Sequence, residues 1–162
     1  MRLTFIPMDQ SAAAHFRSGG ADAYGNAPER FVSDGDGVPC RCCMRMIGSG
    51  EAYLLLAWRP FSTRHAFSET GPVFVHAEPC ESGTPAEGTL PAFLERADYI
   101  LRGYDTDERI VYGSGGIIAR DHILDRAARL LADPRIASVH VRSSRNNCYH
   151  WRIVPETENP PA

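Results

Sequence analysis

A chain of 162 residues, 43% hydrophobic and 23% charged, has the composition of one globular domain, which excludes a disordered or fibrous protein. The formal net charge of −3 supplies no overall positive field, so we expect no nucleic-acid partner. All 17 basic residues are arginine, which excludes mechanisms that need a Schiff-base or phosphate-loop lysine.

The apolar segments are too short for a membrane helix, which needs ~20 residues. The longest strongly apolar run, residues 52–58, has the length of a strand. Pro7 and Asp9 end the first apolar run before the core of a signal peptide could form. We therefore expect no membrane partner and a cytoplasmic location, where thiols stay reduced. Five cysteines, an odd number, also argue against a disulfide framework.

The first half of the chain combines short regular elements with long loops. Strands are predicted at residues 2–6, 51–58 and 73–77. The run at 51–58 shows no alternation of polar and apolar residues, so we expect it in the centre of a sheet. Residues 11–17 predict a short helix. The segments 18–39 and 78–91 are rich in residues that break regular structure and predict loops.

The second half predicts two hairpins with a helix between them. Residues 99–104 and 109–113 flank a polar four-residue turn, and residues 136–142 and 148–154 flank a loop of five. The helix, at about residues 121–132, carries its apolar side chains on one face. These elements predict a single α+β domain over residues 1–154 with a mostly antiparallel sheet, followed by a flexible tail at 155–162.

The last hairpin has a pattern that assigns its two faces. A five-residue loop pairs His140 with His150 and places every apolar residue on the opposite face. Arginine forks and paired histidines predict an anion-binding site made of His140, Arg142, His150 and Arg152. The alternative is the solvent-exposed side of an edge hairpin, where such residues are common.

The cysteine cluster offers a second candidate site. Cys40 and Cys43 have the spacing of half a zinc site. The other half must come from elsewhere in the chain, from His76 with Cys80 or from Cys148 with His150. Three alternatives stay open: a thioredoxin-like redox pair, a Cys–His nucleophile that uses Cys80 or Cys148, and plain burial of the thiols.

Several segments together resemble a bacterial family known only as domain of unknown function 1203. The resemblance runs from about residue 40 to residue 153 and rests on Cys40-Arg41-Cys42-Cys43, residues 50–51, 54–56, 60–61, 69–76, 104–105, 109–113 and 139–143, Cys80 and Cys148. It implies a stand-alone bacterial domain with no known activity. In the family pattern Cys40, Cys43, Cys80 and Cys148 are matched cysteines and Cys42 is an extra one. The resemblance thus favours those four thiols as metal ligands.

Three classes of function follow from these observations. The first is a non-catalytic domain that binds a ligand or a metal ion, with zinc as the candidate cofactor. The second is a structural or protein-interaction module without a bound ligand. The third is a Cys–His enzyme, which we favour least because the sequence names no ordered partner for the thiol. The partner is an unidentified small molecule or protein.

Overall fold

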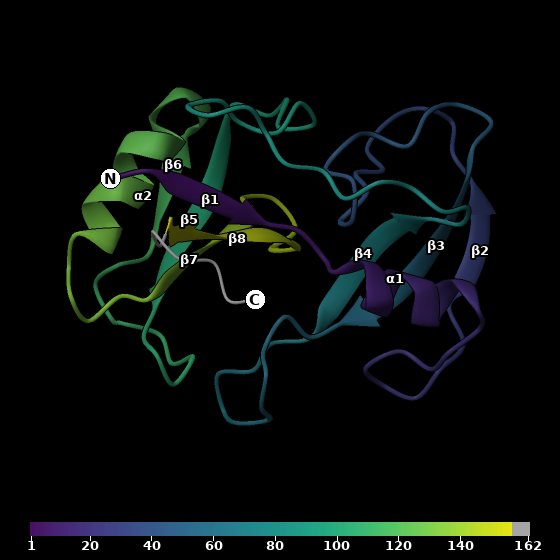
Figure 1. The fold of residues 1–162 in the computed structure, drawn as a ribbon, viewed down its shortest axis with the longest axis horizontal. Coiled ribbons are helices and arrows are strands. Elements are labelled where there is room, and N and C mark those ends of the chain that lie inside the picture. The colour runs from purple at the N-terminus through teal and green to yellow at the C-terminus, as the bar shows by residue number, and fades with distance from the viewer. Residues whose placement is uncertain (157–162) are drawn as a thin grey trace.

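The computed structural model of the chain, which describes residues 1–156, contains two antiparallel sheets that lie beside one another (Figure 1). The larger sheet has the order β1-β8-β7-β5-β6, with β1 at Leu3–Ile6, β8 at Tyr149–Pro155, β7 at Ser138–Ser143, β5 at Asp98–Tyr104 and β6 at Gly116–Ala119. The smaller sheet has the order β2-β3-β4, with β2 at Glu29–Val32, β3 at Ala52–Trp58 and β4 at Gly71–His76. The prediction of an α+β protein with mostly antiparallel strands is confirmed.

Each sheet carries one helix on a face (Figure 1). The predicted main helix is present as a 3-10 turn, η1 (Arg120–His122), continued by α2 (Ile123–Leu131). Its buried side chains join the core of the larger sheet, as the helical spacing predicts; these are Ile123, Ala127, Leu130 and Leu131. On the smaller half, α1 (Gln10–Arg17) begins at Asp9, whose carboxylate accepts a hydrogen bond from the amide of Ala12 at 2.7 Å. The predicted central strand, β3, lies between β2 and β4.

The first predicted hairpin is wrong in its second strand. β5 pairs with β6 and β7, and the returning segment 109–113 forms a single bridge between Tyr104 and Ile110. The reason is Ser114, whose hydroxyl accepts a hydrogen bond from the amide of Gly103 at 2.9 Å and so replaces a ladder partner. The close approach requires glycine at position 103, because a Cβ there would lie 3.1 Å from Cβ of Ser114. Strand pairing resumes only at Gly116.

The last hairpin keeps the predicted core face but not the predicted register. Val141 lies opposite Trp151 and His140 opposite Arg152, a shift of two residues that preserves which face the apolar residues occupy. The register then shifts between Val141 and Arg142, so that Arg142 pairs with Tyr149 and His150 is the extra residue of a bulge.

This bulge separates the residues that the sequence placed on one polar face. Tyr149 turns its ring to His140, with centroids 5.1 Å apart, whereas His150 packs against Phe93 and Tyr99 in the core under α2. The face that carries His140 is also covered rather than solvent-exposed, since the side chain of His140 is 2% exposed. Phe61, from the segment between β3 and β4, covers it with its ring 5.2 Å from that of His140.

The predicted boundary between the domain and its tail falls inside β8. Pro155 is the last residue of β8 and pairs with Leu3, and the amide of Glu156 donates to the carbonyl of Arg2. Residues 157–162 of the predicted tail lie outside the described residues. Within residues 1–156, no helix has the length and apolar character needed to cross a bilayer.

The protein should become less stable as the pH is lowered, because two histidines are buried as neutral rings. Burial, together with the charge of Arg142, holds the pKa of His140 well below its ordinary value of 6.5, and burial with the charge of Arg41 does the same for His150. Below about pH 6.5 the unfolded chain takes up protons that the folded chain does not. We therefore expect the free energy of unfolding to drop by about 1.4 kcal/mol per pH unit for each histidine.

Urea denaturation between pH 7.5 and pH 5 measures this slope. His140→Phe and His150→Phe should each flatten it, whereas His122→Phe, at an exposed position, should leave it unchanged. A free energy of unfolding that is constant over this range would contradict the prediction.

Candidate metal centre

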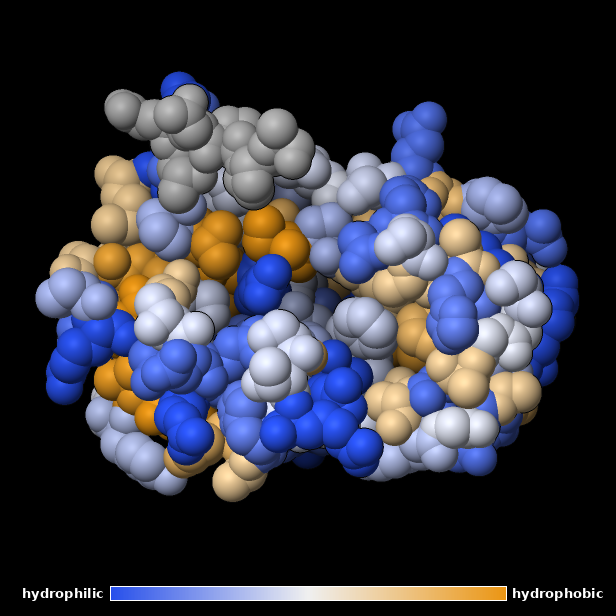
Figure 2. Space-filling model, turned by 60° about the horizontal axis from the view of Figure 1, so that its bottom comes forward, coloured by the Kyte–Doolittle hydropathy of each residue, from blue (hydrophilic) through white to orange (hydrophobic). Residues whose placement is uncertain are grey.

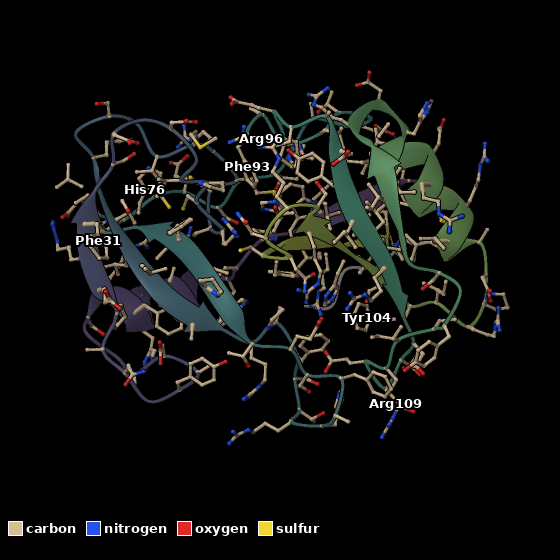
Figure 3. All side chains as sticks on the ribbon, turned by 180° about the vertical axis from the view of Figure 1, so that it is seen from behind. Phe31, His76, Phe93, Arg96, Tyr104 and Arg109 are labelled. Carbon is tan, nitrogen blue, oxygen red and sulfur yellow. The ribbon has the colours of Figure 1, made fainter. Side chains whose placement is uncertain are left out.

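Four side chains with metal-binding atoms converge at one edge of the smaller half. The ligand atoms of Cys40, Cys43, His76 and Cys80 all lie within 4.8 Å of one another. The sulfur atoms of Cys40 and Cys80 are 3.9 Å apart, and Sγ of Cys43 lies 3.5 Å from Nδ1 of His76. Figure 3 shows His76 in a region where yellow sulfur atoms gather.

A tight turn places the first two thiols. The amide of Met44 donates to the carbonyl of Cys40 at 3.1 Å, and the amide of Cys40 donates to the carbonyl of Arg45 at 2.9 Å. Met44 takes a positive φ of 56°, which lets the chain reverse within these few residues. Both sulfur atoms of the Cys40–Cys43 pair can therefore reach one point.

The end of β4 brings in the other two ligands. The amide of Arg41 donates to the carbonyl of Phe74 at 2.9 Å, which fixes the cysteine turn against this strand. His76 is the last residue of β4, and its own amide points at Sγ of Cys40 at 3.4 Å. Cys80 follows four residues later, at the start of the loop that leaves the strand.

Helix α1 supports this second half of the site from the other side. Gln10 donates from Nε2 to the carbonyl of Cys80 at 2.8 Å. Arg17 donates from Nε to the carbonyl of His76 at 3.0 Å and lies with Nη2 3.2 Å from Sγ of Cys80. One arginine thus orients both ligands and places positive charge beside a sulfur atom.

The separations between Cys40 and Cys80 and between Cys43 and His76 are close to those of a tetrahedral zinc site. Zinc–sulfur bonds of about 2.3 Å and zinc–nitrogen bonds of about 2.0 Å put two sulfur ligands about 3.8 Å apart and a sulfur about 3.5 Å from a nitrogen. The second ring nitrogen of His76, Nε2, lies 3.6 Å from Oε2 of Glu51. This carboxylate lies beyond hydrogen-bond distance of the ring, on the side away from Cys43, and its Oε2 accepts a hydrogen bond from the amide of Gly48 at 2.6 Å.

The thiols resist ionisation in the absence of a cation. Hydrogen bonding with Cys40 and burial raise the pKa of Cys43 to about 12. The pKa of Cys40 is also raised, because the neighbouring thiol of Cys80 and burial outweigh the stabilising hydrogen bond with Cys43. A bound cation would supply the positive charge that thiolates need in this buried place.

The buried charge next to this site is Arg41. Its guanidinium donates to the carbonyls of Pro39 at 2.6 Å and Tyr149 at 2.7 Å and lies 5.8 Å from the centre of the Phe74 ring. Burial lowers its pKa to about 10, so the side chain is charged at neutral pH. Within residues 1–156 it forms no ion pair with a carboxylate.

The structure brings together three of the four predicted thiol ligands. Cys148 lies in the turn between β7 and β8, with Sγ 3.8 Å from the carbonyl of Asn146, and is not part of the group of four ligand atoms. His76, which the sequence offered as a partner of Cys80, takes the fourth position. Cys42 is buried beside the site without joining it.

The predicted anion-binding residues are divided, because His140 lies opposite Arg152 in the ladder of β7 and β8 but His150 is turned away from them. His150 lies in the core under α2, and Arg142 is held by a carboxylate: Oε2 of Glu69 lies 2.7 Å from Nη2 of Arg142 and 3.0 Å from Nη1 of Arg102. Sequence reasoning missed Glu69, as it missed Glu51 and Arg17, because single charged residues in loops and helices carry no spacing signal.

Gly83 should be essential for the packing of the loop that carries Cys80. Its amide donates to the carbonyl of Cys42 at 3.0 Å, and an added Cβ would lie 1.8 Å from the backbone oxygen of Cys43. We expect Gly83→Ala to lower the free energy of unfolding by about 1 to 3 kcal/mol, as overpacking does. Gly71→Ala, where a Cβ meets open space, is the control and should change it by less than about 0.5 kcal/mol. Denaturant titration of both variants measures this, and equal stabilities would refute the close approach.

Comparison with known proteins identifies the family but no activity. No curated protein and no solved structure matches the chain. A family described as "Protein of unknown function (DUF1203)" matches residues 37–154, a range that includes all four converging ligands and excludes α1. The chain therefore belongs to the DUF1203 family.

Proposed function

We propose that this chain is a non-catalytic metal-binding domain that holds one structural zinc ion with Cys40, Cys43, His76 and Cys80. The observation that carries the proposal is the convergence of four donors at separations that suit one tetrahedral ion. Three sulfur ligands and one imidazole are the donor set that zinc prefers. Bound there, zinc would act as a crosslink between the cysteine turn, β4 and the loop after β4.

The arrangement supports a structural rather than a catalytic ion. A catalytic zinc keeps one coordination position for water or substrate, whereas four protein ligands fill the tetrahedron. Three thiolates with one Zn²⁺ carry a net charge of −1. The buried charge of Arg41 and the guanidinium of Arg17 at 3.2 Å from Cys80 would balance it. This balance gives Arg41 a counter-charge although it has no carboxylate partner in the described part of the chain.

The burial and the raised pKa of Cys43 argue against a Cys–His enzyme. Cys43, His76 and Glu51 lie in the order of a nucleophile, a base and a residue that orients the base. A cysteine nucleophile must be an accessible thiolate, but Cys43 is 2% exposed and its pKa is raised to about 12. Cys43 and His76 are therefore better suited to bind a metal ion than to catalyse a nucleophilic reaction.

A reducing compartment is part of the proposal. Ligand thiols must stay unoxidised to bind zinc, and the sulfur atoms of Cys40 and Cys80 are close enough to be oxidised together. We accordingly propose a cytoplasmic location in a bacterium, in line with the family resemblance.

Metal analysis of the purified protein tests the site directly. We expect one equivalent of zinc and, after exchange for cobalt, the absorption of a tetrahedral thiolate complex. Cys43→Ser, Cys80→Ser and His76→Ala should each lose the metal or the cobalt spectrum. Cys148→Ser and Cys42→Ser are the matched controls and should keep both. Substoichiometric zinc in the wild-type protein, or loss of zinc in Cys148→Ser instead of His76→Ala, would refute this ligand set.

Arg41 should matter more for the zinc-loaded protein than for the zinc-free one. Arg41→Gln removes the charge that balances the thiolates, so zinc affinity should fall by about tenfold or more, the loss expected for a buried charged partner. Arg129→Gln, at an exposed position on α2, which packs on the larger sheet, is the control and should lose less affinity. Competition with a chromophoric zinc chelator measures both affinities. Equal affinities of the two variants would contradict a role of Arg41 in charge balance.

A further inference from the structure

A pocket opens between the two halves of the molecule, away from the cysteine cluster. Its volume is about 310 Å³, which is in the range of small-molecule sites. It is lined by the link between β1 and α1, by the chain that leaves β3, and by β8; these contribute Ile6–Asp9, Trp58–Ser62, Glu108, Tyr149 and Arg152. The face brought forward in Figure 2 is hollowed between the two halves, with both hydrophilic and hydrophobic residues around the hollow.

Two arginines of this lining have free donors. Arg59 and Arg152 make no side-chain hydrogen bond or ion pair with any of residues 1–156, and Nε of Arg59 is buried without a partner. A guanidinium offers five donors in a fork that fits a carboxylate or a phosphate. Buried donors without partners cost free energy, so a ligand that accepts hydrogen bonds here would be favoured.

The carboxylates of the lining are already engaged. Oε2 of Glu108 accepts hydrogen bonds from the amide and the hydroxyl of Ser62 at 2.7 and 2.9 Å. The carboxylate of Asp9 accepts from the amide of Ala12 and the hydroxyl of Ser11, and these bonds lower its pKa. Neither carboxylate forms an ion pair with the two arginines, so both guanidinium groups stay available to a ligand.

The rest of the lining is aromatic and backed by further positive charge. Trp58, Phe61 and Tyr149 form apolar walls. Behind them His140 lies with its ring 5.2 Å from Phe61 and 5.1 Å from Tyr149. Arg102, which lies opposite His140 in the sheet, shares the single carboxylate of Glu69 with Arg142. Tyr104, whose hydroxyl also points to this carboxylate, marks this layer in Figure 3.

We propose that this pocket binds a small organic anion, with its carboxylate or phosphate group between Arg59 and Arg152 and a flat apolar body against the aromatic walls. The site shares no residue with the four zinc ligands. It also differs from the anion site predicted from the hairpin, since Arg152 is the member of that set that lines this pocket. Neutral His140 packs against two of these walls, and Arg142, paired with Glu69, supplies positive charge nearby without touching the ligand.

Binding to the zinc-loaded, full-length protein is measured by calorimetry and by NMR shift perturbation with four probes. Benzoate and phenyl phosphate combine an anionic group with a ring, benzyl alcohol keeps the ring without the charge, and inorganic phosphate keeps the charge without the ring. We expect at least one of the first two to bind at least tenfold more tightly than both benzyl alcohol and inorganic phosphate. Comparison of benzoate with phenyl phosphate then tells a carboxylate ligand from a phosphate ligand.

Variants locate the site and separate it from the zinc proposal. Arg59→Gln and Arg152→Gln should each weaken the better anionic probe by about tenfold or more, the loss expected for a charge-assisted hydrogen bond. Arg129→Gln, at an exposed position on α2, should bind like the wild-type protein. Zinc content and circular dichroism should be unchanged in all three. Failure of both organic anions to bind, equal binding of benzyl alcohol, equal binding of inorganic phosphate, or full affinity in both pocket variants would overturn the proposal.

Discussion

One buried residue, Arg41, connects the two sheets of this fold, and its guanidinium makes the contact to the larger sheet. Its side chain donates to the carbonyl of Tyr149 in β8 at 2.7 Å, while its amide donates to Phe74 in β4 at 2.9 Å and its carbonyl accepts from Met8 at 2.8 Å. The two sheets share no strand, and this residue bridges them through main-chain acceptors. A buried charge is costly unless it is hydrogen-bonded and balanced, so the position of the nearby thiols matters for the whole molecule.

The predictable part of the fold is the part determined by local periodicity. The alternation of apolar residues through Val139, Val141 and Trp151 settles which face meets the core, because a strand has a period of two. It does not settle register, since a slip of two residues preserves every face. The bulge at His150 also lies beyond such reasoning, because one extra residue reverses the parity of everything on one side of it. As the extra residue, His150 is turned away from the predicted polar face and packs in the core.

Local sequence patterns also identified only some of the ligands of the candidate metal centre. Cys40 and Cys43 could be identified from their spacing because the chelate closes within one turn. The choice between His76 and Cys148 depends on the pairing of the cysteine turn with β4, which is a long-range contact that no local pattern encodes. The supporting contact from Arg17 was harder still to predict, since α1 lies outside the part of the chain that matches the family.

The two proposed sites are mechanically connected through Tyr149. Its carbonyl is held by Arg41 in the cysteine turn, and its ring forms a wall of the pocket and packs on His140. The bulge in β8 is what turns this ring toward the pocket. A zinc ion that rigidifies the cysteine turn would thereby hold Arg41, and through it one wall of the anion pocket, in a single position. A structural metal in this protein would then serve binding at a distance, by reducing the freedom of a contact surface rather than by touching the ligand.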